Sequence, residues 1–307
     1  MYTAVMRAVT TAAFIAFFLV ARSAAQAHVI CGDRVFPATL TMDDPGVGNE
    51  FSLPTIQHIP SPASQSTTIG YEWDKSITQD LGFAVNGDYI QQGNPGPAQN
   101  GWDNITITLK DELPCIDKHE LAWSVGVVRE IIGTGSKQLS GAGAIDTVSS
   151  TAPTFYVGKG LGDLKSDFWR PFAVTGEVSR IFSDSPLASP NAWAYSASLQ
   201  YSMPYQMQHI KALNVPRWVG RLIPLVEFSM TNVDNGGPPT GTIAPGILYE
   251  ANTWQVGVEA LLPSNSTTRM QQGVGYVLQF HLFLDDFAYK DFFGKPIINK
   301  DLWGEKQ

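Results

Sequence analysis

The chain has 307 residues, of which 16% are charged and 11% are aromatic, and its formal net charge is −8. This acidic balance makes nucleic acid and anionic membrane surfaces poor partners. Charged residues are scarcer than the roughly 25% that is usual in soluble domains. The composition therefore indicates a surface that is covered in part by something other than water.

Residues 1 to 27 predict a secretory signal peptide. They contain Arg7 but no acidic residue, continue with an apolar run from Ala12 to Val20, and end on Ala25-Gln26-Ala27, a small-x-small cleavage pattern. A retained membrane helix would need about 20 apolar residues, and this run is too short. We expect cleavage near Ala27 and export from a Gram-negative bacterial cytoplasm.

Residues 28 to 50 are expected to form an N-terminal periplasmic segment. Cys31 lies in it, and Cys115 follows within the exported part of the chain. An even pair of cysteines in an oxidising compartment predicts a disulfide, which would stabilise the fold by roughly 4 kcal/mol on the chain-entropy model. Two unpaired thiols are the alternative.

The clearest secondary-structure signal is a period-two alternation of apolar and polar residues, which is typical of a β-strand. From 193 to 203 one face is apolar with aromatic ends and the other is rich in serine. Similar patterns recur at 254–262 and 274–285. Their lengths match the nine to eleven or so residues of a tilted membrane-crossing strand better than the roughly five or six of a sandwich strand.

Twelve strands are predicted between residues 51 and 286. They begin near Phe51, Thr68, Leu81, Asn104, Glu120, Thr154, Phe172, Trp193, Arg221, Thr242, Trp254 and Val274. An even number places both chain ends on the periplasmic side. The connections on that side are mostly short turns, at 78–80, 114–118, 162–170 and 251–253, with a longer exception at 205–220. Connections on the other side are longer and rich in Gly, Pro, Asn and Ser, as in extracellular loops. A polar C-terminal tail follows at 287–307.

These strands predict an all-β fold: a closed, up-and-down, antiparallel transmembrane β-barrel of about 12 strands, which leaves no unpaired edge in lipid. A secreted β-sandwich would show the same alternation and stays the alternative fold. The apolar faces are expected to meet lipid, with Trp193, Tyr195, Leu199, Tyr201, Trp254, Val256, Val258, Tyr276, Leu278, Phe280 and Leu282 as candidates. The other faces would line a lumen, with Glu72, Asp74, Asn86, Asp88, Lys110, Glu177, Glu227, Glu259, Gln279 and His281 as candidates.

Several phrases of the sequence resemble a family of transporter-like outer-membrane barrels. They are residues 71–78, 153–164, 170–176, 245–247, 255–260 and 279–286, and the resemblance covers most of the exported chain. Members are labelled as outer-membrane proteins of the MetA pathway of phenol degradation. The resemblance implies a barrel that passes small molecules, and it carries over no catalytic residue. The polar tail departs from the terminal aromatic residue on which many such barrels end.

The sequence offers no pattern for chemistry. The five histidines form no HExxH motif, so we expect no metal site and no cofactor. No GxSxG motif is present, and we predict a non-enzymatic protein of the cell outer membrane.

Three functions remain open from the sequence. The first is a channel or porin-like transporter for a small hydrophobic or cationic solute, and a mostly acidic lumen would favour cations. The second is a structural or partner-binding barrel with a plugged lumen. The third is a barrel-embedded hydrolase. The expected partners are outer-membrane lipid, the solute, the barrel assembly machinery and a periplasmic protein.

Overall fold

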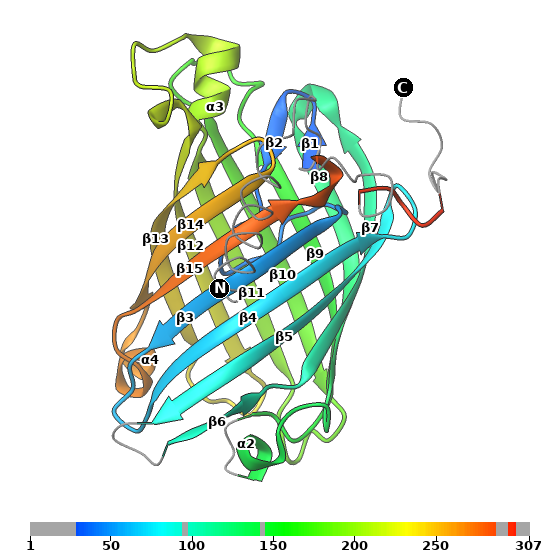
Figure 1. The fold of residues 1–307 in the computed structure, drawn as a ribbon, viewed down its shortest axis with the longest axis vertical. Coiled ribbons are helices and arrows are strands. Elements are labelled where there is room, and N and C mark those ends of the chain that lie inside the picture. The colour runs from blue at the N-terminus through cyan, green and yellow to red at the C-terminus, as the bar shows by residue number, and fades with distance from the viewer. Residues whose placement is uncertain (1–28, 94–97, 142–144, 287–293, 299–307) are drawn as a thin grey trace, which may run out of the picture.

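The computed structural model describes residues 29–93, 98–141, 145–286 and 294–298. In this part of the chain twelve long strands follow one another, each antiparallel to the next (Figure 1). They are β3 (Glu50–Ile59), β4 (Gln65–Ser76), β5 (Leu81–Gly93), β7 (Ile105–Ile116), β8 (Leu121–Ile131), β9 (Ser150–Gly160), β10 (Phe172–Ser183), β11 (Ala192–Tyr201), β12 (Leu222–Val233), β13 (Thr240–Glu250), β14 (Trp254–Pro263) and β15 (Gly275–Phe283). The short β6 (Gln99–Trp102) extends the sheet beside β5. The predicted signal peptide lies outside the described residues.

The last strand pairs with the first and closes the barrel. Strand β15 runs antiparallel to β3 from Tyr276 opposite His58 to Phe283 opposite Glu50, with one register shift between Gln279 and His281. Closure gives both edge strands a hydrogen-bonding partner, so none of the twelve long strands is left as an exposed edge. The predicted closed, twelve-strand antiparallel barrel is confirmed.

The two ends of the barrel differ. One end, here called the plug end, carries the connections 77–80, 117–120, 161–171, 202–221 and 251–253, together with the start of β3 and the end of β15. The opposite loop end carries α2 (Lys137–Gly141) and α4 (Ser266–Gln271) (Figure 1). Both ends of the barrel sequence therefore lie on one side, as an even strand number requires. Which side faces the periplasm stays a prediction.

The long connection at the plug end is partly helical. It contains α3 (Met203–Tyr205), a π-helical turn η2 (Gln206–Ile210) and a 3-10 turn η3 (Val219–Arg221). Ser202 caps α3 by accepting a hydrogen bond from the Tyr205 N–H at 3.2 Å. No helix among the described residues combines the length and the apolar character that a membrane span requires.

The polarity of the barrel wall is inverted relative to a water-soluble protein. Apolar side chains of the strands, such as Val178, Leu199 and Val258, are 39% to 49% exposed on the outer surface. Polar ones such as Thr175, Gln200 and Glu227 are 1% or 2% exposed and point inward. Soluble proteins bury the apolar set and leave charged residues such as glutamate in water. The eleven residues predicted to face lipid are all exposed or half-buried on this outer surface.

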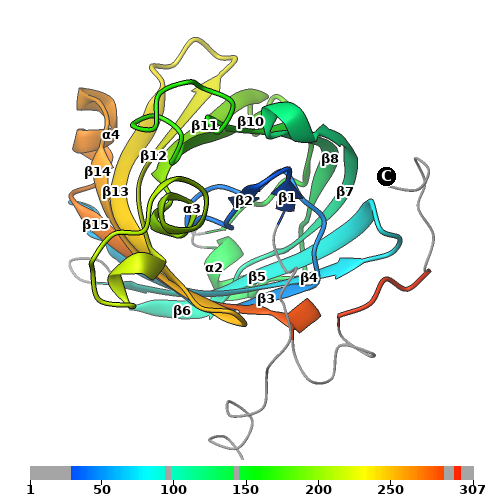
Figure 2. The same ribbon diagram turned by 90° about the horizontal axis from the view of Figure 1, so that it is seen from above.

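Residues 29 to 49 lie inside the barrel, and we call this segment the plug. It starts with a hairpin of β1 (Val29–Cys31) and β2 (Arg34–Phe36) at the plug end and continues along the inner wall to β3 (Figure 2). Its Leu40 joins a buried apolar cluster with Ile223 and Leu248 of the wall. The segment that was expected in the periplasm thus occupies the lumen.

Glycines of the inner wall make room for the plug. A Cβ added at Gly257 would lie 2.4 Å from Cδ1 of Leu40 and 2.6 Å from a methyl group of Leu248. A Cβ at Gly158 would lie 3.0 Å from the ring of Phe36. Because close packing leaves no space for an extra methyl group, side chains at these positions would compete with the plug.

The predicted disulfide is not formed, and Cys31 and Cys115 are free thiols. They are nevertheless neighbours, because their Sγ atoms and a carboxylate oxygen of Asp117 all lie within 4.8 Å of one another. The Cys115 thiol is 2.8 Å from Oδ1 of Asp117. The prediction from the even number of cysteines was correct in placing the two residues together and wrong about the bond between them.

The packing at Gly257 predicts a compensating pair of substitutions. Gly257→Val should displace Leu40 and raise amide hydrogen exchange in residues 37–49, whereas Gly257→Val combined with Leu40→Ala should restore protection because the two volumes offset each other. Gly176→Val on the outer wall, where an added Cβ has 3.4 Å to its nearest neighbour, is the control. Equal protection in all three variants would contradict this packing.

Candidate functional site

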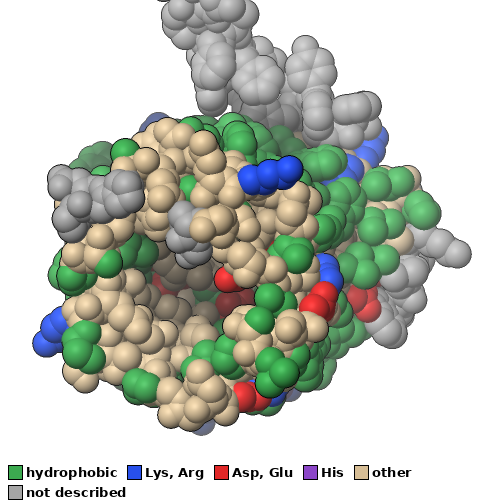
Figure 3. Space-filling model, turned by 90° about the horizontal axis from the view of Figure 1, so that it is seen from below, with side chains coloured by type: hydrophobic (Ala, Val, Ile, Leu, Met, Phe, Trp, Pro, Cys, Tyr) green, Lys and Arg blue, Asp and Glu red, His purple; other side chains and the backbone are tan. Residues whose placement is uncertain are grey.

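The candidate site is the lumen. A cavity of about 340 Å³ lies between the plug and the inner wall, lined by plug residues 38–43 and by strands β3 to β5, β7 to β10 and β15. Seen from the loop end, the barrel is hollowed, and acidic side chains are visible inside (Figure 3). The cavity thus forms a polar vestibule that the plug bounds on one side.

The structure places the ten predicted lumen residues on the inner wall in two groups. The first group lines the vestibule: Glu72, Asn86, Asp88, Glu177, Gln279 and His281. The second group lies beside the plug or against another inward carboxyl group: Asp74, Lys110, Glu227 and Glu259. The sequence did not show that a segment of the chain lies between these two groups.

Part of the vestibule wall is held by hydrogen bonds among its own polar groups. The Asn86 amide donates to Glu72 at 2.7 Å. The imidazole of His281 lies between Glu50 at 2.5 Å and the Ser52 hydroxyl at 2.7 Å. Such contacts satisfy buried polar groups and fix their orientation. Oδ1 of Asn86 and Oε1 of Gln279 have no partner in the described part of the chain, so they remain able to bind a solute or water.

Two groups of polar contacts attach the middle of the plug to opposite sides of the wall. The Thr41 backbone N–H donates to Glu227 of β12 at 2.8 Å, and the Thr41 hydroxyl also donates to that carboxylate. On the other side, Lys110 of β7 forms a salt bridge of 2.5 Å with Asp43 and donates to the carbonyl of Asp44 at 3.0 Å. The plug is therefore held across the lumen.

The side chain of Asp44 is buried inside the lumen beside Lys110. Burial raises the pKa of Asp44 to about 7, because desolvation disfavours the carboxylate, while the positive charge of Lys110 acts in the opposite direction. The backbone N–H of Gly46 donates to this side chain at 2.7 Å and fixes the local turn of the plug.

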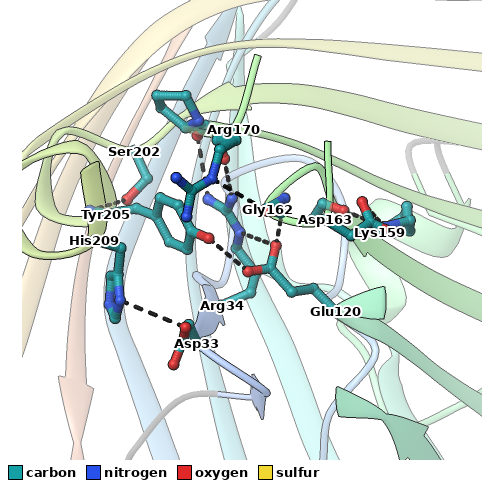
Figure 4. A network of polar contacts seen from close by, with 12 residues as sticks. Asp33, Arg34, Glu120, Lys159, Gly162, Asp163, Arg170, Ser202, Tyr205 and His209 are labelled. Carbon is teal, nitrogen blue, oxygen red and sulfur yellow. Dashed lines mark hydrogen bonds and ion pairs between the residues drawn. The ribbon is translucent and has the colours of Figure 1, made fainter. Parts of the chain in front are cut away.

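At the plug end, Arg34 of the hairpin is the centre of a polar network that we call the latch (Figure 4). Its guanidinium is fully buried and binds Glu120 at 3.2 Å and the carbonyl oxygens of Pro171 at 3.2 Å and Arg170 at 2.5 Å. It also lies 3.7 Å from the ring centre of Tyr205, a cation–π contact. Burial lowers the pKa of Arg34, and Glu120 opposes this shift.

Glu120 connects Arg34 to two other connections at the plug end. Its carboxylate accepts hydrogen bonds from the Tyr205 hydroxyl at 2.8 Å and from the Gly162 N–H at 2.9 Å, besides the contact with Arg34. Its backbone has a φ of +46°, in the left-handed region, which costs a non-glycine residue roughly 1–3 kcal/mol. The latch contacts keep this strained residue in place.

The latch explains the long connection at the plug end. Residues 202–221 bring Tyr205 against Arg34 and His209 within 3.6 Å of Asp33, so this connection folds over the hairpin of the plug (Figures 2 and 4). No local sequence pattern signals the roles of Arg34, Glu120 and Tyr205, because their contacts join positions 85 and 86 residues apart.

No family model and no curated protein matches the chain. Among solved structures, it is similar to an outer membrane channel from Pseudomonas putida F1, at 12% identity and a TM-score of 0.49 over 81% of this chain and 99% of that one. The NanC porin matches at 8% identity and a TM-score of 0.47, over 75% and 98% of the two chains. The KdgM porin matches at 10% and 0.45, over 74% and 98%. These values are too low to assign a family, so the resemblance to the phenol-degradation family stays a prediction.

The latch predicts that Arg34→Lys frees the plug hairpin. Lysine keeps the charge but cannot make the forked contacts of a guanidinium, and the lost hydrogen bonds amount to roughly 1.5–3 kcal/mol. Amide exchange in residues 29–36 should rise about ten- to a hundredfold. Arg129→Lys is the matched control, since Arg129 pairs with Asp184 on the exposed surface. Unchanged exchange in the hairpin of the Arg34→Lys protein would contradict the latch.

Proposed function

We propose that the protein is a non-enzymatic outer-membrane channel for a small cationic solute, with the plug as the element that must move for passage. The observation that carries this proposal is the combination of an inverted wall and an acidic vestibule. The outer surface suits lipid, and the inner surface holds polar groups around a cavity.

The outer surface supports the membrane part of the proposal. Its apolar strand faces lie between two belts of aromatic residues, which is the pattern of barrels that cross a bilayer. At the plug end the belt includes Phe172 beside Tyr201, at 5.0 Å between ring centres, and Tyr249 beside Trp254, at 5.4 Å. At the loop end it includes Trp102 beside Tyr89, at 5.4 Å. Aromatic side chains of this kind favour the interface between acyl chains and headgroups.

The vestibule supports a cationic solute. Glu72, Asp88 and Glu177 of the wall line it together with Asp43 of the plug. The nearest inward lysine, Lys110, is already engaged by Asp43. Carboxylates in a confined pore attract cations and repel anions, so the vestibule favours ammonium-like or metal cations over carboxylates and phosphates.

The plug favours a second candidate function, a structural or partner-binding barrel that does not conduct. The latch and the contacts of Thr41 and Asp43 hold the plug at three places. The channel proposal requires these contacts to open, whereas the structural proposal requires them to persist. A barrel hydrolase has no comparable support from the described residues, and its test is turnover of phospholipid.

Planar-bilayer recording tests the channel and its selectivity. A variant lacking residues 29–48 should conduct more than the full-length protein and prefer potassium over chloride. Adding Glu72→Gln, Asp88→Asn and Glu177→Gln to the deletion should shift the reversal potential toward that of a nonselective pore. Asp184→Asn, in an exposed loop, should leave the reversal potential unchanged. Absence of conductance in the inserted deletion variant would favour the structural barrel.

The membrane part has a separate test. Val258→Arg places a charge on the outer wall near the middle of β14 and should lower the free energy of unfolding in phosphatidylcholine vesicles by roughly 2–4 kcal/mol. Leu187→Arg changes a fully exposed apolar residue of the loop 184–191 and should have little effect. If the two substitutions cost the same, the outer wall does not contact lipid.

A further inference from the structure

Two buried glutamates of the inner wall form no ion pair with any of the described residues. Glu227 of β12 and Glu259 of β14 are each 1% exposed. By contrast, Arg34 pairs with Glu120 and Lys110 pairs with Asp43. Glu227 and Glu259 lie outside the vestibule lining, beneath the part of the plug that contains Thr41.

The strand register brings these two carboxyl groups together. Glu227 lies opposite Ala244 of β13, and Glu259 lies opposite Gly246 of the same strand. A Cβ on Gly246 would lie 2.3 Å from Cγ of Glu259. The side chain of Glu259 therefore extends across β13 toward β12, where only alanine and glycine stand between the two acids. Each carboxyl group is then a direct neighbour of the other.

Beyond the contact of the two carboxyl groups with each other, several oxygen atoms around this pair have no hydrogen-bond partner among the described residues. They are Oε1 of Glu227, both carboxylate oxygens of Glu259, and the hydroxyl of Ser198. Ser198 of β11 is 1% exposed and lies directly opposite Glu227 in the register, on the same inward face. Cross-strand neighbours of this kind have Cβ atoms about 4.5–5.5 Å apart, so the Ser198 hydroxyl points into the space beside the Glu227 carboxylate.

Two adjacent carboxylates cannot be buried without compensation, because an unpaired buried charge costs several kcal/mol. A bound cation compensates both charges and gives every unpartnered oxygen a ligand role. The donor set contains oxygen alone, which hard cations prefer to the soft thiophilic metals. Two carboxylates match a divalent ion, and irregular sets of carboxylate and hydroxyl oxygens suit Ca²⁺ better than Mg²⁺, which demands octahedral geometry.

We propose that Glu227, Glu259 and Ser198 form a Ca²⁺ site on the inner wall, completed by the Thr41 hydroxyl of the plug. The Thr41 hydroxyl already donates to the Glu227 carboxylate, so it lies at the site. The ion joins strands β11, β12 and β14 to the plug. This site does not depend on conduction, because it requires the folded barrel and plug alone.

Isothermal titration of the detergent-solubilised, chelator-treated protein with CaCl₂ tests the proposal. Wild type should bind one Ca²⁺ with a Kd on the order of 0.1–1 mM, as extracellular modules do, and bind Mg²⁺ more weakly. Glu259→Gln and Ser198→Ala should each weaken this binding roughly tenfold or more. Glu130→Gln is the matched control, because Glu130 hydrogen-bonds to Asn104 near the loop end. It should bind like wild type.

Two results would overturn the site. The first is wild-type protein that binds no Ca²⁺ at millimolar concentration, with a melting temperature that rises on acidification, since the two carboxyl groups then share a proton. The second is Ca²⁺ binding that survives in both Glu259→Gln and Ser198→Ala, which places the ion elsewhere. Because Ser198→Ala removes no charge, it stays informative if the glutamine variant fails to fold. Neither result bears on the bilayer test of the channel.

Discussion

The closed hydrogen-bonded wall is the constraint on which the rest of the structure depends. Once β15 pairs with β3, every long strand has two neighbours, and the two faces of the sheet become an outside and an inside. In the proposed bilayer, the acyl chains around the barrel favour apolar side chains on the outer face. The polar side chains then lie on the inner face. Where the plug covers them, they need hydrogen-bonding partners other than bulk water.

The plug supplies part of the hydrogen bonding that the inward polar side chains require. Its backbone and side chains donate or accept where the wall would otherwise present unpaired groups, as Thr41 does for Glu227 and Asn49 does for Ser76. Small residues such as Gly158 and Gly257 keep the wall thin where Phe36 and Leu40 pack. Arg34 holds the hairpin by contacts to three separate turns, so the plug end is fixed by one residue with many partners.

Much of the barrel could be predicted from the sequence because alternation is a local signal. Predicted strand starts such as Leu81, Phe172 and Trp254 coincide with those of the structure, and the inward or outward side follows from the same alternation. The plug could not be predicted, because its hairpin has strands of three residues and its contacts reach partners up to 236 residues away. The role of residues 202–221 in covering the hairpin could not be predicted for the same reason, because Tyr205 contacts Arg34, which is distant in the sequence.

The same alternation that identifies an inward carboxylate says nothing about what compensates it. Glu120 just before β8, Asp43 of the plug and Glu227 of β12 are all acids of the lumen or the plug end, yet the first meets a buried arginine, the second a lysine, and the third another glutamate. The partner of each acid depends on the side chains of the residues that lie between the acid and its neighbours. For Glu227 and Glu259 that residue is Gly246, which leaves the space between them open. A larger residue there would separate the two carboxyl groups, so the absence of a side chain on β13 brings together the two acidic groups that the lumen must neutralise.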